Sequence, residues 1–145
     1  MATVGQILET KGHEVYCVRP DETVADALRV MADKNVGSVL VKEDDRLVGI
    51  FTERLYARRV FLEGRTSPTT LVRDVMKKDV IYVEPGQTAE ACMALMADKK
   101  IRHLPVLRDG SLVGIISIGD LMRSTIADRE FDIEQLVRYV AGAMR

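Results

Sequence analysis

The sequence predicts an α/β protein built from two similar halves, each with the element order β-α-β-β-α. The first observation is an internal repeat. Shifting the chain by 65 residues places residues 15–59 over residues 80–124 without a gap, with 15 identical residues in 45 positions. The second is that strand-like runs and helical spacings of apolar residues follow the same order in both copies. Two copies are too few for a solenoid, so we expect one domain made of two halves packed face to face.

The first strand and the first helix of each half follow from the order of their residue types. A run of β-branched and aromatic residues, Val15–Val18 or Val80–Val83, is soon followed by a proline, which cannot donate to a ladder. Thr23 and Thr88 then stand where a helix N-cap is expected, and apolar residues follow at helical spacing. We therefore expect a strand, a turn and an amphipathic helix in this order.

Two further strands and a second helix complete each half. The strand-like runs are joined by polar turns and comprise Ser38–Val41, Leu47–Phe51, Leu104–Leu107 and Leu112–Ile116. The turn of the second half contains Asp109-Gly110, a dipeptide typical of a two-residue hairpin. The closing helices should begin near Thr52 and Ser117, each directly after a strand.

The segments outside the repeat include two short pieces that are similar to each other. Residues 3–9 and 71–76 predict short helices that lead into the first strand of each half. Residues 64–68 are polar and rich in turn formers, which indicates a linker. We therefore divide the chain into residues 1–64, with the first repeat, and residues 65–145, with the second repeat and a C-terminal helix.

The C-terminal segment predicts a separate helix with Asp132 as its cap. Its apolar residues should lie on one side of this helix and comprise Phe131, Ile133, Leu136, Val137 and Val140. An apolar face requires a partner, which is either the domain itself or a second subunit.

Composition and charge exclude several classes of function. The chain has 145 residues, 21 basic and 22 acidic, and a net charge of −1, whereas proteins that bind polyanions by bulk charge carry a basic excess. No apolar run approaches the roughly 20 residues that span a bilayer. The two cysteines and two histidines form neither a disulfide framework nor a cluster with metal-ligand spacing. We therefore expect a cytoplasmic protein with no metal, no membrane association and no nucleic-acid partner.

The segments Leu112–Leu121 and Ile101–Val106 resemble the signature of the cystathionine β-synthase (CBS) domain. Over residues 15–126 the arrangement is similar to a tandem CBS pair, or Bateman module, as in small free-standing bacterial two-domain proteins. The resemblance implies two α/β halves packed as a pair and a site for an adenine nucleotide such as AMP, ADP, ATP, S-adenosylmethionine or NAD. It also implies that the bound state regulates another process.

The best candidate site lies at the predicted start of the second helix in the second half. Backbone N–H groups there are unpaired and carry partial positive charge, which suits a phosphate or a ribose oxygen. The resemblance assigns Asp120 to the ribose hydroxyls and places Ser117 and Gly119 beside the ligand. The alternative is a helix cap alone, with Ser117 at the N-cap and Asp120 at N3.

Arg102 and His103 come directly before a strand, at positions that the resemblance assigns to the ligand. Arginine offers a planar fork for phosphate oxygens, and histidine adds a donor of tunable charge. The alternative is that Arg102 is a solvated strand-end residue and that His103 is a half-buried, satisfied one. The resemblance adds Leu104, Pro105 and Val80 to the residues that contact the ligand.

The first half departs from the family pattern at one position. Thr52 and Arg54 match, but Leu55 stands where the family has an aspartate, so this half lacks the carboxylate for a ribose. Arg54, with Arg58 and Arg59, could serve the phosphates of a longer ligand or could form a solvated helix face. The sequence therefore predicts one intact site and one degenerate site.

We compare three classes of function, which differ in whether the protein binds a ligand and whether it converts that ligand. The first is a regulatory adenine-nucleotide module, a homodimer that senses energy or redox state and signals through an effector protein or through assembly. The alternative is a structural dimerisation module without a ligand. An enzyme is disfavoured because the sequence shows neither a nucleophile beside a base nor paired carboxylates, so we expect no catalytic residue. The sequence does not identify the nucleotide, the effector or the pathway.

Overall fold

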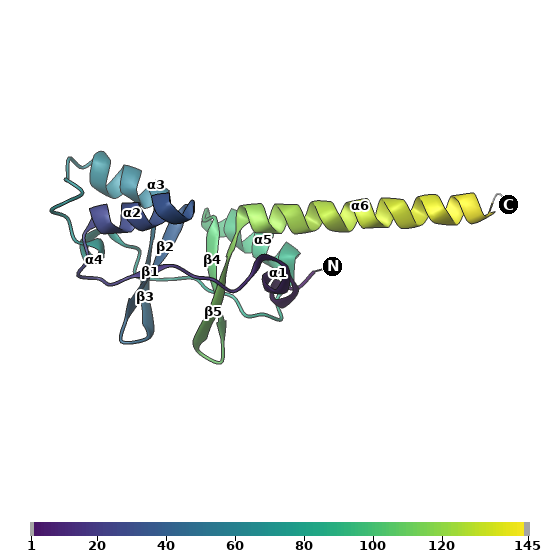
Figure 1. Cartoon of the computed structure of the whole chain (residues 1–145), viewed down its shortest axis with the longest axis horizontal. Helices are drawn as coiled ribbons and strands as arrows, with labels where there is room; N and C mark the ends of the chain where they lie inside the picture. Colours follow the sequence, from purple (N-terminus) through teal and green to yellow (C-terminus); the bar gives the residue numbers. More distant parts are fainter. Residues whose placement is uncertain (1, 144–145) are drawn as a thin grey trace. The chain divides into compact units, whose positions relative to one another are not determined.

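In the computed structural model, which describes residues 2–143, the chain forms two compact units (Figure 1). One unit comprises residues 14–81, and the other joins the N-terminal residues up to 13 to the residues from 82 onward. This division differs from the boundary expected between residues 64 and 65. The reason is that the short helix ahead of each repeat packs with the other repeat.

The unit of residues 14–81 is a three-stranded sheet with helices packed on it. Its elements are β1 (Cys17–Val18), α2 (Val24–Lys34), β2 (Ser38–Glu43), β3 (Arg46–Thr52), α3 (Glu53–Tyr56), the π-helix η1 (Ala57–Phe61) and α4 (Val72–Val75). The strand order is β1-β2-β3, with β1 parallel to β2 and β2 antiparallel to β3. The order β-α-β-β-α predicted for this half is confirmed, although β1 is shorter than expected and the last helix changes to π geometry.

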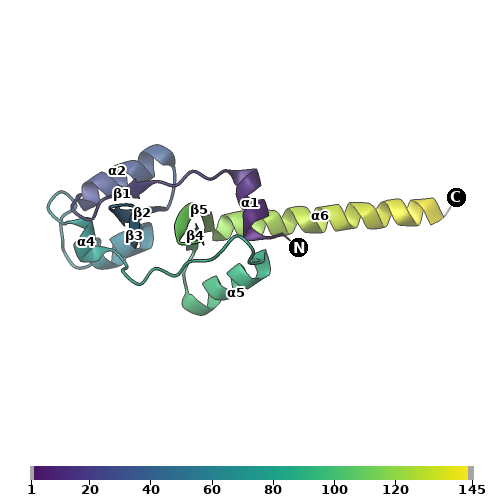
Figure 2. The same cartoon turned by 90° about the horizontal axis from the view of Figure 1, so that it is seen from below.

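The other unit is built around a two-stranded antiparallel hairpin. Its elements are α1 (Val4–Lys11), α5 (Ala89–Lys99), β4 (His103–Arg108), β5 (Ser111–Ser117) and α6 (Ile118–Ala143). The strand expected over residues 80–83 is wrong, because Val83 makes only an isolated parallel bridge with Val106. Both α1 and α5 contact α6, and Figure 2 shows them on either side of its first turns.

Two glycines allow the short helices to pack closely on the hairpins. A Cβ atom on Gly114 of β5 would lie 2.7 Å from Cδ2 of Leu8 in α1. A Cβ atom on Gly49 of β3 would lie 2.5 Å from Sδ of Met76, which directly follows α4. Both distances are shorter than real side chains tolerate, so glycine is what lets Leu8 and Met76 approach. α1 therefore packs closely against β5, and α4 packs closely against β3.

The hairpin turn predicted at Asp109-Gly110 is confirmed. Both residues have positive φ, 51° and 80°, as a two-residue turn of this type requires. In the first half, Asp44 and Asp45 adopt the same geometry, with φ of 50° and 65°. Aspartate is among the residues that tolerate this region, which explains how two acidic residues can form the same turn without glycine.

α6 is one continuous helix of 26 residues where the sequence predicted two. Asp132 lies in its interior and is not a cap. The segment between Gly119 and Gly142 contains neither proline nor glycine, so nothing interrupts the backbone hydrogen bonds. Despite this length, neither α6 nor any other helix among the described residues is apolar enough over a sufficient length to cross a membrane.

Candidate functional site

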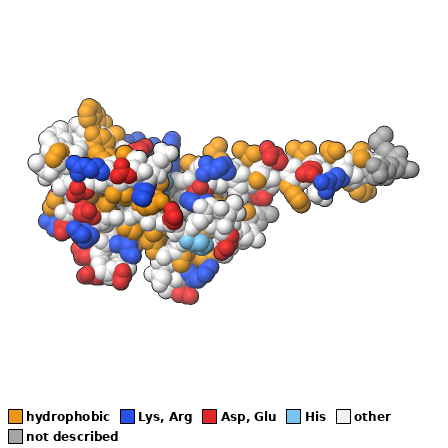
Figure 3. All heavy atoms as spheres, in the orientation of Figure 1, with side chains coloured by type: hydrophobic (Ala, Val, Ile, Leu, Met, Phe, Trp, Pro, Cys, Tyr) orange, Lys and Arg blue, Asp and Glu red, His pale blue; other side chains and the backbone are white. Residues whose placement is uncertain are grey.

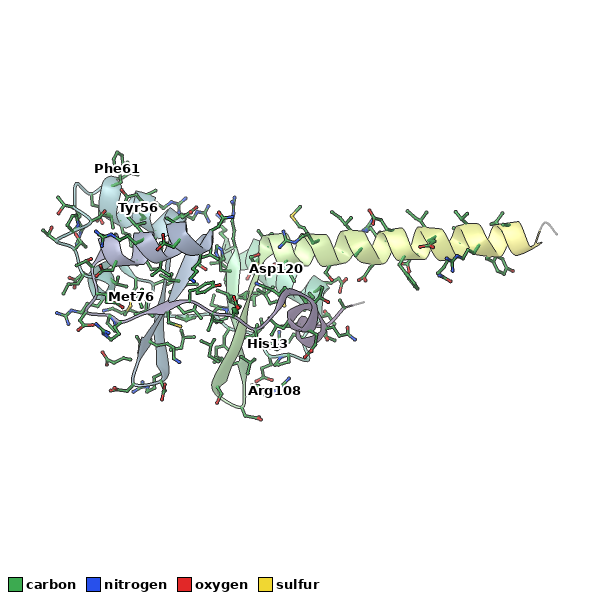
Figure 4. All side chains as sticks on the ribbon, viewed as in Figure 1. His13, Tyr56, Phe61, Met76, Arg108 and Asp120 are labelled. Atoms are coloured by element: carbon green, nitrogen blue, oxygen red, sulfur yellow. The ribbon has the colours of Figure 1, made fainter. Side chains whose placement is uncertain are left out.

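The junction between β5 and α6 positions the carboxylate of Asp120. β5 ends at Ser117, and α6 begins at the next residue. The backbone N–H of Ser117 donates to Oδ2 of Asp120 at 2.8 Å, and the N–H of Asp120 donates to Oγ of Ser117 at 3.2 Å. These two bonds form a capping box, so the capping role expected for this pair is present. The same bonds fix the direction of the carboxylate in the first turn of α6 (Figure 4).

Two cations also bind Asp120. Nζ of Lys11, at the end of α1, lies 2.7 Å from Oδ2, and Nη2 of Arg123 lies 2.7 Å from Oδ1. Lys11 donates a second hydrogen bond to the carbonyl of Ile115 at 2.9 Å. An ammonium group has three hydrogens to donate, so one remains beyond these two contacts. The side chain of Lys11 is 30% exposed, whereas that of Asp120 is only 6% exposed, so Lys11 links a buried carboxylate to the surface.

The charge of Asp120 is maintained by these contacts. Burial alone would raise its pKa, but the hydrogen bonds from Lys11 and from the Ser117 amide, together with the charge of Lys11, outweigh burial and lower the pKa below its ordinary value. The carboxylate is therefore ionised at neutral pH. Because two cations surround one anion, the cluster of Lys11, Asp120 and Arg123 carries a positive excess.

His103 and Arg102 lie beside this cluster at the start of β4. His103 is the ladder partner of Ser117, and the carbonyl of Arg102 accepts a hydrogen bond from the N–H of Ile118 at 2.9 Å. Burial is the main cause that lowers the pKa of His103. Asp120 opposes this change, and the charges of Lys11 and Arg102 add to it. The imidazole is therefore neutral at pH 7.

The remaining predicted site residues differ in what they can offer a ligand. Leu104 and Pro105 are buried in β4, where they support the strand below His103. Gly119 is in the first turn of α6, where an added Cβ would lie 3.3 Å from Nη1 of Arg123. One unit thus brings together seven of the ten residues predicted from the sequence, and these are Arg102, His103, Leu104, Pro105, Ser117, Gly119 and Asp120.

The other three predicted residues, Thr52, Arg54 and Val80, belong to the unit of residues 14–81. Oγ1 of Thr52 accepts a hydrogen bond from the N–H of Leu55 at 3.1 Å, which caps α3. Leu55 is half-buried and packs against the core of this unit. The first half therefore repeats the hydroxyl cap but has an apolar side chain where the second half has the carboxylate.

Two members of the cluster are absent from the sequence prediction. Arg123 has a local signal, because a cation three residues after an acid on a helix is a common ion pair. Lys11 has none, since 109 residues separate it from Asp120 and its helix was expected to precede the first strand.

A family model described as "CBS domain" matches the chain twice, over residues 4–59 and 72–126. The chain belongs to the CBS domain family. It is similar to a solved protein with CBS domains from Burkholderia ambifaria MC40-6, with 49% identity and a TM-score of 0.86, over 88% of this chain and 96% of that chain. The mitochondrial CBS domain-containing protein CBSX3 of Arabidopsis thaliana is 35% identical over 150 residues, or 97% of this chain and 72% of that protein.

The tandem arrangement predicted from the repeat is confirmed, because both matches of the family model fall on the repeats. The fold also matches that of the CBS domain pair of protein MJ0100, solved in complex with 5′-methylthioadenosine and S-adenosyl-L-methionine. That similarity has a TM-score of 0.77 at 18% identity, over 88% of this chain and 98% of that chain, and shows the common fold. Proteins with such CBS pairs are regulatory and signal-transduction modules.

Proposed function

We propose that this CBS pair is a regulatory module that binds an adenine nucleotide and reports its presence to another protein or through assembly. The observation that carries the proposal is the ionised carboxylate of Asp120, fixed in the first turn of α6 and paired with Lys11. A charged acceptor in this position suits a ribose diol, because each hydroxyl can donate to it. The complex of the MJ0100 pair with two adenosine compounds supports this ligand class for the fold.

The positive excess around Asp120 favours a phosphorylated ligand. Lys11 and Arg123 contact the carboxylate, and Arg102 lies close enough for its charge to lower the pKa of His103. Phosphate oxygens accept well from such cations, whereas the sulfonium of S-adenosylmethionine is repelled by them. We therefore expect AMP, ATP or NAD to bind more tightly than S-adenosylmethionine.

A panel of ligands in a thermal-shift experiment tests this function. AMP, ADP, ATP, NAD, S-adenosylmethionine and GMP are each added to the full chain at millimolar concentration. A ligand at about 100 times its dissociation constant adds about 2.7 kcal/mol to the free energy of unfolding. For a chain of this size that is a rise in melting temperature of about 5–10 °C. We expect the rise with adenine nucleotides and a smaller one with GMP. A flat panel would leave the structural dimerisation module as the function.

Lys11 allows a sharper test, because its third N–H can reach a ligand oxygen. We expect Lys11→Met to weaken AMP binding about tenfold, the loss of one charge-assisted hydrogen bond, and to leave adenosine binding within about threefold. The matched control is Lys99→Met, since Lys99 lies at the end of α5 and is 52% exposed. Isothermal titration gives both affinities. Equal losses for AMP and adenosine would mean that Lys11 only positions Asp120.

The proposal includes no catalysis, so the nucleotide should leave unchanged. Overnight incubation of ATP with the protein, followed by chromatography, checks this point.

The proposal also includes a homodimer in the cytoplasm, where the free thiols of Cys17 and Cys92 stay reduced. A mass near 16 kDa at micromolar concentration in a sedimentation experiment would contradict the dimer.

A further inference from the structure

α6 exposes a row of large apolar side chains along one face, from Met122 to Val140. Its members are between 49% and 63% exposed and comprise Met122, Ile126, Ile133, Leu136, Val137 and Val140, which we call the α6 stripe. Figure 3 shows hydrophobic side chains along the length of this helix, with charged ones between them. α1 and α5 contact α6, yet each member of the stripe keeps about half or more of its surface in water. A soluble helix does not ordinarily expose such a row of large apolar side chains, which indicates an interaction surface.

The spacing of the stripe is that of a coiled-coil seam. Ile126, Ile133 and Val140 follow one another at intervals of seven, and so do Met122, Arg129 and Leu136. Together they fill the a and d positions of a heptad repeat, with β-branched residues at every a and Leu or Met at two of the three d positions. This combination is typical of two-stranded coiled coils.

Phe131 does not belong to the stripe, although the sequence predicted that it would. It lies nine residues from both Met122 and Val140, and nine residues at 100° each place it on the opposite side of the helix. Its side chain is 61% exposed, nearly the same as the 62% of Ile133. The two residues therefore form a matched pair, one on the stripe and one off it.

The charges beside the stripe fit a second copy of the same helix. Arg129 occupies the remaining seam position, and its long stem can pack while the guanidinium reaches outward. Glu130 and Asp132 fall on the flanking e and g positions, where the carboxylates of one helix meet the partner helix. Each α6 thus carries both the cation at the seam and the anions at its edge, so two copies complement each other.

We propose that two copies of the chain associate through the α6 stripe to form a two-stranded coiled coil. The stripe from residue 122 to residue 140 is about 27 Å long at 1.5 Å per residue, or about two and a half heptads. This pairing gives the homodimer of the proposed function a specific contact surface. It does not depend on nucleotide binding.

Sedimentation velocity of the full chain over a concentration series tests the proposal. We expect a dimer for the parent and for Phe131→Asp, and at least a tenfold weaker dimer for Ile133→Asp. The two substitutions are to the same residue on the same helix, and far-UV circular dichroism checks that both variants keep their helix content. A monomeric parent would overturn the pairing of two copies and assign the stripe to a different protein. Equal association of the two variants would also overturn it, and a dimer that persists in both would place the self-association on another surface. Neither result bears on the thermal-shift panel with nucleotides.

Discussion

The closing helices of the two halves start alike and then differ. Oγ1 of Thr52 accepts from the backbone N–H three residues later at 3.1 Å, and Oγ of Ser117 does the same at 3.2 Å. The third residue is Leu55 in one half and Asp120 in the other. Because the first half starts its helix with the hydroxyl alone, a carboxylate is not required for capping. The comparison therefore favours a second role for Asp120, beyond the helix cap that it also forms.

The cations of the two halves also make different contacts. In the first half, Arg59 donates to the carbonyls of Val75 and Met76 at the end of α4, at 3.3 and 3.0 Å. In the second half, Lys11 at the end of α1 reaches the Asp120 carboxylate. In both halves a cation thus joins the end of the short helix to the closing helix. In the first half it binds the last carbonyls of the short helix, and in the second half it binds a carboxylate.

The largest expected effect comes from exchanging the residue that distinguishes the halves. Asp120→Asn keeps the shape of the side chain but removes its charge, so we expect AMP affinity to fall about ten- to a hundredfold, as for losing hydrogen bonds to a charged acceptor. Leu55→Asn should leave AMP affinity within about threefold, since it removes apolar packing in the other unit. Isothermal titration of both variants measures the contrast. Equal affinities for Asp120→Asn and the parent would reduce Asp120 to a helix cap.

The stability of these two variants adds to the comparison. Asp120→Asn leaves Lys11 and Arg123 without a charged partner, so its cost should exceed that of a lost cap and reach about 1–3 kcal/mol in urea unfolding. If Asp120 contacted only its own helix, the loss of the cap would cost under about 1 kcal/mol. The contacts of Lys11 and Arg123 are the reason for the larger value.

An intermediate loss of stability is expected from substituting the two glycines that face the short helices, Gly114 and Gly49. Alanine at either position overpacks a close contact, and we expect Gly114→Ala and Gly49→Ala each to lower the free energy of unfolding by about 1–2 kcal/mol. At Gly114 the three atoms nearest to the added carbon all belong to the Leu8 side chain, at 2.7, 2.9 and 3.3 Å. At Gly49 it meets Sδ of Met76 and also the backbone carbonyl of Lys77, at 3.0 Å.

This difference predicts unequal rescue. Leu8→Ala makes room at Gly114, so the double variant Leu8→Ala/Gly114→Ala should be more stable than the sum of the single losses indicates. Met76→Ala should compensate Gly49→Ala less well, because the carbonyl of Lys77 remains. Urea unfolding of the four single and two double variants gives both coupling energies. A larger coupling at Gly49 would contradict the packing described here.

The smallest expected effect is the pH dependence from His103. The folded chain lowers the pKa of His103, so the neutral form is favoured, and the stability that this confers is complete above the unfolded pKa of about 6.5. It is lost as the pH falls from there toward the folded pKa. The first half has Ser38 at the matching position, so His103→Ser should remove this loss. His13→Ser should retain it. Thermal melts at pH 7.5, 6.5 and 5.5 test this, and identical slopes for both variants would count against a burial effect at His103.

The sequence could predict the elements whose signals are local. The Thr and Ser caps, the Asp109-Gly110 turn and the start of the second helix all depend on residues within a few positions of one another, and the repeat needs only the comparison of the sequence with itself. The residues from 80 to 83 have strand-like composition but form a single bridge, because pairing depends on a neighbour that composition does not specify. Lys11 was missed for the same reason, since its partner is 109 residues away.

The continuity of α6 has a mechanical consequence. Its first turn contains Asp120, which pairs with Lys11 of α1 and with Arg123 one turn later, and its last described residues are about 35 Å further along the axis at 1.5 Å per residue. A tilt of about 5° at the first turn would displace the far end of so long a rod by about 3 Å. A tilt too small to alter the hairpin would thus move the other end of the helix by about the length of a hydrogen bond. α6 is therefore a single rigid connection between the Asp120 carboxylate in its first turn and the apolar stripe, which runs on to Val140.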